Sequence, residues 1–430
     1  MELERIEALP ETGSRQYEIE QRMHQLLSLD PDLERGWPDT LWPVIPDHAL
    51  AVARTAMAEF AHLNGFVKPE SLLAIEAELL AMIRSILDVP EGGATTLTVG
   101  GTESNHLAVK GALFRARAED RLTAPPNIVL AASCHPSFDK TAEEMGIEVR
   151  RVTIGSDFRA DVPAMGAAID GGTIALVGST PNYTHGVIDP VPALGELAQE
   201  HDLWLHIDAC VGGFMLPHIR RLGRLSWEVG FAVEGVTSIS ADLHKLGFTP
   251  TGISTLSVRD EALRKHHSFN LSVDNGWPFR DYARVGFSGS RSGAVIAGAW
   301  ATMVALGADG YLKIASEIFE GAELLAEGFA ETGCLQLSAP HECGVILWES
   351  TDPEVPIAKV GAALIERGWP PTYAIHPPRL HMLLSPLPAR CYEAFLADVR
   401  QAVDDVRAGR AVEEMKLIAY GADPVTGAAP

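Results

Sequence analysis

The stretch Leu203-Trp-Leu-His-Ile-Asp-Ala209 determines how the fold of this chain is organised. Its apolar run predicts a buried strand of a parallel sheet, and the run ends at Asp208. The Asp208 carboxylate is therefore expected at the carboxyl end of the strand, the edge where open parallel sheets bind ligands. A terminal Asp can also simply cap the next helix, so the functional interpretation needs a second residue.

That second residue is a lysine in Ser240-Ala-Asp-Leu-His-Lys245, which follows another short predicted strand, Gly235-Val-Thr-Ser-Ile239. In a cleft, desolvation and bonding to a cofactor favour the unprotonated amine of a lysine. The unprotonated amine can then act as a nucleophile. Pyridoxal phosphate needs a carboxylate at its ring nitrogen and an amine that holds its aldehyde. The pair predicts a pyridoxal-phosphate site, with Asp208 at the pyridinium nitrogen and Lys245 as the Schiff-base lysine.

A glycine turn, Leu97-Thr-Val-Gly-Gly-Thr-Glu-Ser-Asn-His106, leads into a helical pattern at Leu107-Ala-Val-Lys-Gly-Ala-Leu-Phe114. Gly101 lets the backbone approach an anion, and Thr102 is expected to cap the helix, so that amides and a hydroxyl converge on a phosphate. The turn lacks the Lys-Ser/Thr ending of a nucleotide-binding loop and the spacing of a dinucleotide fingerprint. Both of those functions are therefore disfavoured.

Further motifs continue this series along the chain: Cys134-His-Pro-Ser-Phe-Asp-Lys140, Gly178-Ser-Thr-Pro181 with His185-Gly-Val-Ile-Asp-Pro190, His206-Ile-Asp-Ala-Cys-Val-Gly-Gly-Phe214, and Gly289-Ser-Arg-Ser-Gly293. In this order the motifs resemble those of the group II pyridoxal-phosphate decarboxylases, and within that group the sphingosine-1-phosphate lyases. The resemblance implies a fold type I enzyme of the α/β class, with a mainly parallel seven-stranded sheet in a large domain and a smaller C-terminal α+β domain.

The resemblance also implies roles for individual residues. His135 resembles the imidazole that stacks on the cofactor ring and exchanges a proton with the substrate. Thr180 and His185 are expected to line the cofactor and substrate pocket. His244 is expected to face the cofactor phosphate, with Ser240 assisting.

Gly289, Ser290 and Arg291 form a loop of mostly small residues. In the lyases that the chain resembles, this loop reaches the phosphate of the neighbouring subunit's cofactor. The resemblance therefore implies a homodimer with shared active sites.

One departure from the lyase pattern concerns the substrate. The lyases carry an Ala-Pro-Lys-Gly turn after the Schiff-base lysine, and its lysine is associated with the substrate phosphate, whereas this chain has Thr249-Pro-Thr-Gly252. Thr251 cannot supply that positive charge. The candidates to replace it are Arg284, Arg291, His376 and Arg379.

The composition fits a cytoplasmic enzyme that acts on a small molecule. The 430 residues are 47% hydrophobic, and the net charge of −23 disfavours nucleic acid and anionic membrane surfaces. The five cysteines lack metal-ligand spacing, so no metal site is expected. The N-terminal residues are charged, without the apolar core of a signal peptide, and the uncharged stretch 292–308 is slightly short for a membrane span.

Three units are predicted along the chain. Residues 1–55 form an N-terminal arm, with an amphipathic helix and a run rich in Pro and Trp at 36–46. Helical patterns alternate with short apolar strands over 56–305, which predicts the large cofactor-binding domain. Residues 306–430 form the small domain.

The resulting functional hypothesis is a pyridoxal-phosphate-dependent lyase for an amine or amino-acid substrate. Retro-aldol cleavage of a β-hydroxy amine or amino acid comes first, and decarboxylation of an amino acid is the alternative. Both use the same cofactor, because the protein selects the bond that breaks by its orientation against the ring. A remote alternative is a cofactor-binding protein without activity, which the presence of Asp208, Lys245 and His135 disfavours.

Overall fold

The computed structural model describes residues 8, 10–28, 44–66, 69–225, 227–369, 371–375, 377–410 and 414–415. Most of the run rich in Pro and Trp lies outside the described residues, as do His376 and the tail after residue 415. The first described helices, α1 (Gln16–Leu27) and α2 (Asp47–Glu59), precede the large domain in the chain. None of the α1 side chains is buried.

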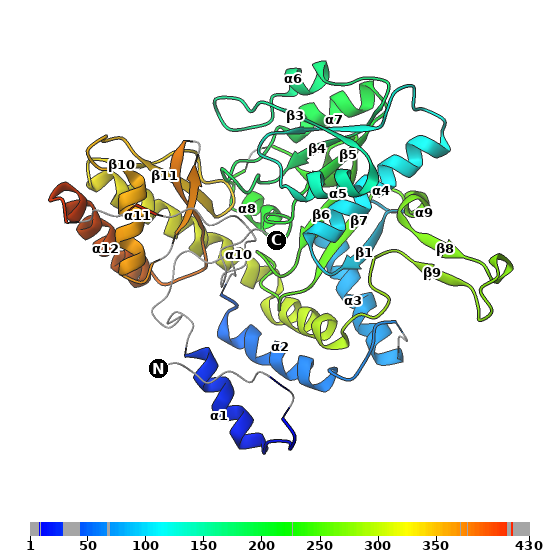
Figure 1. Cartoon of the computed structure of the whole chain (residues 1–430), viewed down its shortest axis with the longest axis horizontal. Helices are drawn as coiled ribbons and strands as arrows, with labels where there is room; N and C mark the ends of the chain where they lie inside the picture. The colour runs from blue at the N-terminus through cyan, green and yellow to red at the C-terminus, as the bar shows by residue number, and fades with distance from the viewer. Residues whose placement is uncertain are drawn as a thin grey trace.

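A seven-stranded sheet forms the centre of the large domain (Figure 1). Its strands, in spatial order, are β1 (Ala94–Thr98), β7 (Ser254–Val258), β6 (Val236–Asp242), β5 (Trp204–Asp208), β4 (Thr173–Ser179), β2 (Asn127–Ala131) and β3 (Glu148–Val152). The five strands from β6 to β3 are parallel, and only β7 runs antiparallel to its neighbours. The expected mainly parallel α/β fold is therefore confirmed.

Helices cover the sheet because its central strands β2, β4 and β5 are buried along their whole length and need cover on both faces. The helices of the large domain are α3 (Glu70–Ile86), α4 (Gly101–Ala118), α5 (Ser137–Met145), α6 (Val162–Ala167), α7 (Val191–Glu200), α8 (Leu216–Arg221) and α9 (Arg264–His267), with short 3₁₀ turns at Gly230–Ala232, Glu261–Leu263 and Val273–Asn275. Side chains of α4, α5, α6 and α7 share one core with β2, β4 and β5. A second core joins α3 to β1 and to the next long helix.

That long helix is α10 (Gly293–Glu331), which connects the two parts of the chain. It crosses the expected domain boundary at 305 and is interrupted by Gly307, whose φ of 59° and ψ of −179° are not helical. Its length and composition alone would allow it to cross a membrane, the one described helix of which this is true. In the structure, half of its most apolar 18-residue window is buried, and the helix packs against α2, α3, α8 and α12.

The C-terminal part contains a four-stranded antiparallel sheet beside the large domain (Figure 1). Its strands, in spatial order, are β10 (Leu335–Leu337), β11 (Val345–Ser350), β13 (Pro378–Leu383) and β12 (Thr372–Ile375). Two helices accompany it, α11 (Ile357–Glu366) and α12 (Ala389–Arg407). The division of the whole chain into three units stays a prediction.

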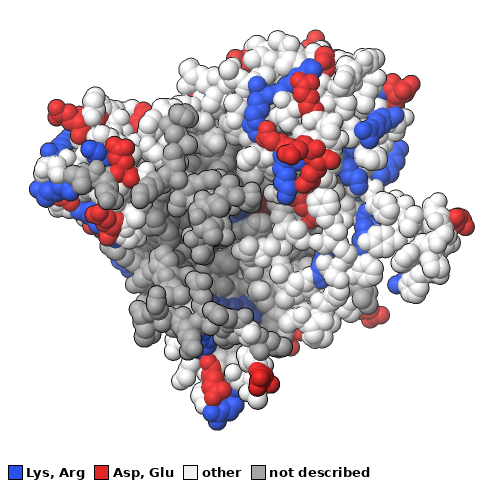
Figure 2. All heavy atoms as spheres, in the orientation of Figure 1, with Lys and Arg blue, Asp and Glu red and all other residues white. Residues whose placement is uncertain are grey.

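A two-stranded hairpin of β8 (Phe269–Leu271) and β9 (Tyr282–Arg284) projects from the large domain (Figure 1). The sequence analysis did not predict it. Its visible face is mostly uncharged (Figure 2), and it leaves large apolar side chains exposed, among them Trp277 and Phe279 at 46% and 71%.

Candidate active site

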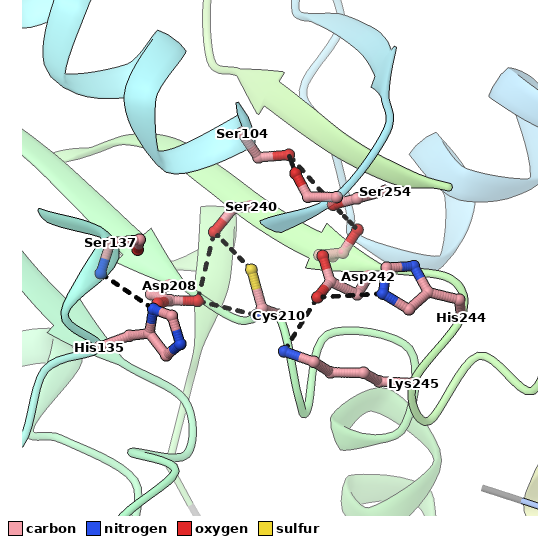
Figure 3. A network of polar contacts seen from close by, with 12 residues as sticks. Ser104, His135, Ser137, Asp208, Cys210, Ser240, Asp242, His244, Lys245 and Ser254 are labelled. Carbon is pink, nitrogen blue, oxygen red and sulfur yellow. Dashed lines mark hydrogen bonds and ion pairs between the residues drawn. The ribbon is translucent and has the colours of Figure 1, made fainter. Parts of the chain in front are cut away.

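Asp208 ends the central strand β5 and is held by donors on several sides (Figure 3). It lies in register with Ser179 on β4 and Ser240 on β6, so three strand ends meet at this level of the sheet. Its Oδ2 accepts a hydrogen bond from Asn105 Nδ2 at 3.1 Å. Its Oδ1 accepts from the backbone N–H of Cys210 at 3.1 Å and from Ser240 Oγ at 3.4 Å.

The surroundings of Asp208 favour its ionised form. Burial by itself would raise the pKa of this carboxyl, because it disfavours the charged state. The neighbouring His135, the hydrogen bond from Cys210 and the charge of Lys245 act in the opposite direction and bring the pKa of Asp208 below its usual value. An anion is therefore available at neutral pH to hold a protonated ring nitrogen.

Lys245 lies in the turn after β6 and contacts a second carboxylate, which the sequence analysis missed. Its Nζ is 3.0 Å from Oδ2 of Asp242, the last residue of β6 (Figure 3). Asp242 is 2% exposed, and its Oδ1 has no hydrogen-bond partner among the described residues. The signal for Asp242 was available, since it ends a strand as Asp208 does and lies three positions before the lysine.

The glycine turn packs closely on this pair. A side chain at Gly101 would place its Cβ 2.6 Å from the sulfur of Cys210 and 3.0 Å from both carboxylate oxygens of Asp242, so only glycine fits. The prediction that Thr102 caps α4 was wrong. The N-cap is Gly100, without a side-chain cap, because the helix begins two residues earlier than the sequence suggested and Thr102 already lies in its first turn.

Two histidines at the site hold their protons on different ring nitrogens. Nδ1 of His135 accepts the backbone N–H of Ser137 at 3.1 Å, so the neutral ring carries its proton on Nε2. Nδ1 of His244 lies 2.6 Å from the carbonyl oxygen of Ile253, which can only accept, so this ring carries its proton on Nδ1. Burial lowers the pKa of His135, which favours its neutral form.

These groups surround a cavity of about 330 Å³. Its lining includes Gly100, Gly101, Thr102, His135, Asp208, Asp242, His244, Lys245 and Thr251. The volume lies within the range of small-ligand sites. Glycine amides at a helix start, an ionised carboxylate and a lysine on one cavity are the set of groups that pyridoxal phosphate requires, so the residues present fit this cofactor.

Several predicted residues do not line this cavity. Thr180 is buried behind it, and its neighbours Ser179 and Pro181 contribute to the wall instead. His185 stacks on Phe158, with ring centroids 4.7 Å apart. Ser240 is fully buried and contacts Asp208 and Cys210.

The predicted cations lie apart from Lys245. Arg284, Gly289 and Arg291 line a separate cavity of about 530 Å³, and Ser290 binds Asn64 through its Oγ at 2.9 Å. Arg291 forms a bidentate ion pair with Glu76, at 3.0 and 3.1 Å.

Arg379 is also engaged within the chain. It pairs with Glu349 at 2.8 Å and covers the ring of Phe158. His376 lies outside the described residues. Within one chain, none of the described candidates Arg284, Arg291 and Arg379 lines the cavity that Thr251 lines.

The comparisons with known proteins establish the family of the chain. Residues 51–350 match the model of the pyridoxal-dependent decarboxylase conserved domain. The chain therefore belongs to the pyridoxal-dependent decarboxylase family, and family membership implies pyridoxal phosphate as its cofactor. It is a pyridoxal-phosphate-dependent lyase of that family.

Among its relatives are sphingosine-1-phosphate lyases. The lyase of Oryza sativa is 36% identical over 386 residues, which cover 88% of this chain and 70% of the relative. The solved sphingosine-1-phosphate lyase of Burkholderia pseudomallei is 32% identical, with a TM-score of 0.87 over 95% of this chain and 94% of that one. A probable L-tyrosine/L-aspartate decarboxylase of Methanocella arvoryzae is 34% identical over 330 residues, which cover 76% of this chain and 83% of the relative.

Proposed function

We propose that this protein cleaves a carbon–carbon bond in a β-hydroxy amine or β-hydroxy amino acid by a retro-aldol reaction. The observation that carries the proposal is the likeness to sphingosine-1-phosphate lyases over nearly the whole chain, combined with one cavity that holds both Asp208 and Lys245. The bond that breaks joins the amine-bearing carbon to its hydroxyl-bearing neighbour, and the products are an aldehyde and a shorter amine.

The cofactor, when bound, supplies an electron sink for the breaking bond. The chain's own residues then bind and orient the reactants. Asp208 holds the proton of the ring nitrogen, Lys245 holds the cofactor until substrate arrives, and the amides at Gly100 and Gly101 bind its phosphate at the start of α4.

Proton transfer falls to the two histidines. The reaction needs one group that takes the hydroxyl proton and one that returns a proton to the amine-bearing carbon. In their neutral forms, His244 presents a bare Nε2, which can accept, and His135 presents a protonated Nε2, which can donate. Both line the cavity.

Thr251 favours a substrate without a phosphate group, or a small amino acid. It lines the cavity, and the arginines Arg284, Arg291 and Arg379 are engaged elsewhere in the chain. A phosphate at this position would therefore have none of these three arginines of the same chain to pair with it. The substrate would instead be recognised by its amine, its hydroxyl and any carboxylate.

Decarboxylation of an amino acid is the second candidate, because the Methanocella relative is a probable amino-acid decarboxylase at 34% identity. Product analysis separates the two. We expect an aldehyde without carbon dioxide when the purified enzyme is incubated with β-hydroxy amines and β-hydroxy amino acids. Release of carbon dioxide with a primary amine would support decarboxylation, and Lys245→Ala protein is the control for uncatalysed breakdown.

The shared-site homodimer belongs to the same proposal. The cavity that contains Gly289 and Arg291 lies apart from Lys245 of the same chain, and the hairpin beside it exposes Trp277 and Phe279. Both features suit a surface that a second copy covers.

A further inference from the structure

A series of polar side chains lies behind Asp208 on the same face of β5. Trp204, His206 and Asp208 alternate along this strand, so all three point the same way. On the neighbouring strand β6, Ser238 and Ser240 alternate in the same manner. All five side chains are buried, and none of them except Asp208 lines the cofactor cavity.

Hydrogen bonds join these side chains into one chain. The indole Nε1 of Trp204 lies 2.7 Å from Ser238 Oγ, which lies 2.8 Å from Nδ1 of His206. Nε2 of His206 lies 3.1 Å from Oδ1 of Asn105 and 3.3 Å from Ser240 Oγ. Asn105 and Ser240 are also the two side chains that donate to Oδ2 and Oδ1 of Asp208.

The direction of each bond follows from the chemistry of the groups. An ionised carboxylate only accepts, so Asn105 turns its amide nitrogen toward Asp208 and its Oδ1 toward His206. Because Oδ1 only accepts, Nε2 of His206 carries the ring proton and Nδ1 is bare. The indole N–H only donates, so the hydroxyl of Ser238 accepts from Trp204 and gives its own proton to Nδ1.

His206 stays neutral in this environment, so it carries a single ring proton, and the nitrogen that carries this proton determines how Asn105 is oriented. Burial lowers the pKa of His206 to about 4, although the nearby Asp208 acts against this. The other tautomer would set the bare Nε2 against Oδ1 of Asn105. The amide would then gain by rotating, and its carbonyl oxygen would face the carboxylate of Asp208.

We infer that Trp204, Ser238 and His206 are positioning residues, which hold Asn105 and Ser240 as donors to Asp208 and so keep its carboxylate ionised toward the cofactor's ring nitrogen. The inference rests on the role given to Asp208 in the proposed function. The charged or titratable groups that otherwise face Asp208 are His135, Lys245, Cys210 and Cys134.

Two variants test the inference: Ser238→Ala, which removes the donor to Nδ1, and Trp204→Phe, which removes the first N–H of the chain. The first measurement is ¹⁵N NMR of the histidine rings in the cofactor-free protein. We expect His206 of the parent protein to remain the Nε2–H tautomer between pH 5 and pH 8, and Ser238→Ala to give a mixture of tautomers. This readout needs no substrate, so it is independent of the reaction that the enzyme catalyses.

The second measurement is the protonation of the ring nitrogen in protein loaded with ¹⁵N-labelled pyridoxal phosphate, together with the pH dependence of kcat and KM. In both variants less of the ring nitrogen should carry its proton near neutral pH than in the parent, because Asp208 without its donors has a higher pKa and competes for that proton. The loss of activity in these variants should appear as a lower kcat, with KM for the substrate little changed.

Trp348→Phe is the matched control. Trp348 is also fully buried, but its Nε1 has no hydrogen-bond partner among the described residues, so this variant loses packing without losing a hydrogen bond. It should leave the tautomer of His206 and the ring-nitrogen titration unchanged. The inference is overturned if Ser238→Ala keeps a single Nε2–H tautomer, or if the tautomer changes while the ring nitrogen titrates as in the parent. A protein without lyase turnover would count against the proposed function, while both ¹⁵N measurements would still decide the inference.

Discussion

The ammonium nitrogen of Lys245 lies 3.0 Å from the carboxylate of Asp242, and only 2% of Asp242 is exposed to solvent. Burial alone would lower the pKa of Lys245, but Asp242 outweighs it and raises the pKa above the ordinary value, with smaller contributions from Cys210 and Asp208. The lysine must lose its proton before it can bond the cofactor. Asp242 therefore opposes cofactor loading at neutral pH, and it holds the amine in place until the cofactor bonds to it.

The Asp242→Asn variant should load pyridoxal phosphate at lower pH than the parent protein. Without the carboxylate, the pKa of Lys245 falls by at least about one unit, or ~1.4 kcal/mol, so more of the amine is unprotonated at a given pH. The measurement is the rate of the absorbance change after the cofactor is added to the cofactor-free protein, followed from pH 6 to pH 9. Asp202→Asn is the control, since the side chain of Asp202 is 69% exposed and remote from the lysine. Equal loading rates for Asp242→Asn and the parent protein at each pH would contradict the prediction.

Lys245→Ala should abolish the covalent attachment of the cofactor. Borohydride fixes pyridoxal phosphate on the lysine that bonds it, and the labelled peptide of the parent should contain Lys245. The variant should take up no fixed label, whereas Lys313→Ala, at an exposed position on α10, should label as the parent does. Stoichiometric label on another lysine of the Lys245→Ala protein would show that the assignment is wrong.

A mixture of two inactive variants should recover activity if the sites are shared between subunits. Lys245→Ala removes the nucleophile from one cavity, and Arg291→Ala alters the loop that lines the other. A hybrid dimer would contain one site with both residues intact, so up to about one quarter of the parent activity should return on random mixing. Proven hybrids without recovery would mean that one chain supplies the whole site.

Thr251→Lys should improve the use of a phosphorylated amine. A charge-assisted hydrogen bond to phosphate typically contributes about 1.5–3 kcal/mol, or one to two factors of ten in affinity. The gain should appear in kcat/KM for a phosphorylated β-hydroxy amine relative to the unphosphorylated one, with the absorbance spectrum of the resting enzyme unchanged. Efficient cleavage of phosphorylated long-chain amines by the parent would refute the inference from Thr251.

The stability of the cofactor-free protein should fall as the pH is lowered from 6.5 toward 4, in part because of His267. Its side chain is 1% exposed and has no hydrogen-bond partner among the described residues, and burial lowers its pKa from 6.5 to about 4. In this range the unfolded chain binds a proton that the native protein does not, so each such group lowers the free energy of unfolding by about 1.4 kcal/mol per pH unit. Above pH 6.5 the effect is absent.

Denaturant unfolding of the parent and of His267→Leu protein at pH 7, 6 and 5 checks this. The difference in the free energy of unfolding between the two proteins should change with pH below 6.5, since the variant has lost one titrating group. Parallel curves for the two proteins over this range would exclude His267 as a contributor.

The sequence by itself determined the strand that carries Asp208 and the residue that ends it. The apolar run 203–207 is observed as β5 at Trp204–Asp208. Asp208 and Lys245 could be selected as candidates because a strand end and the following loop are local features, and because pyridoxal phosphate demands a carboxylate and an amine. The placement of Trp204, His206 and Asp208 on one face of β5 also follows, because side chains alternate between the two faces along a strand.

Only the tertiary structure decided which of these residues meet. Asn105 reaches Asp208 across 103 positions of the chain, and Trp204 meets Ser238 across 34. The separation of Arg291 from the Lys245 cavity, and its pairing with Glu76, likewise depend on how α3 and α10 pack around the sheet. The physical reason is that local sequence fixes the period of a strand or helix, whereas the neighbours of each strand are chosen by the burial of apolar surface along the whole chain.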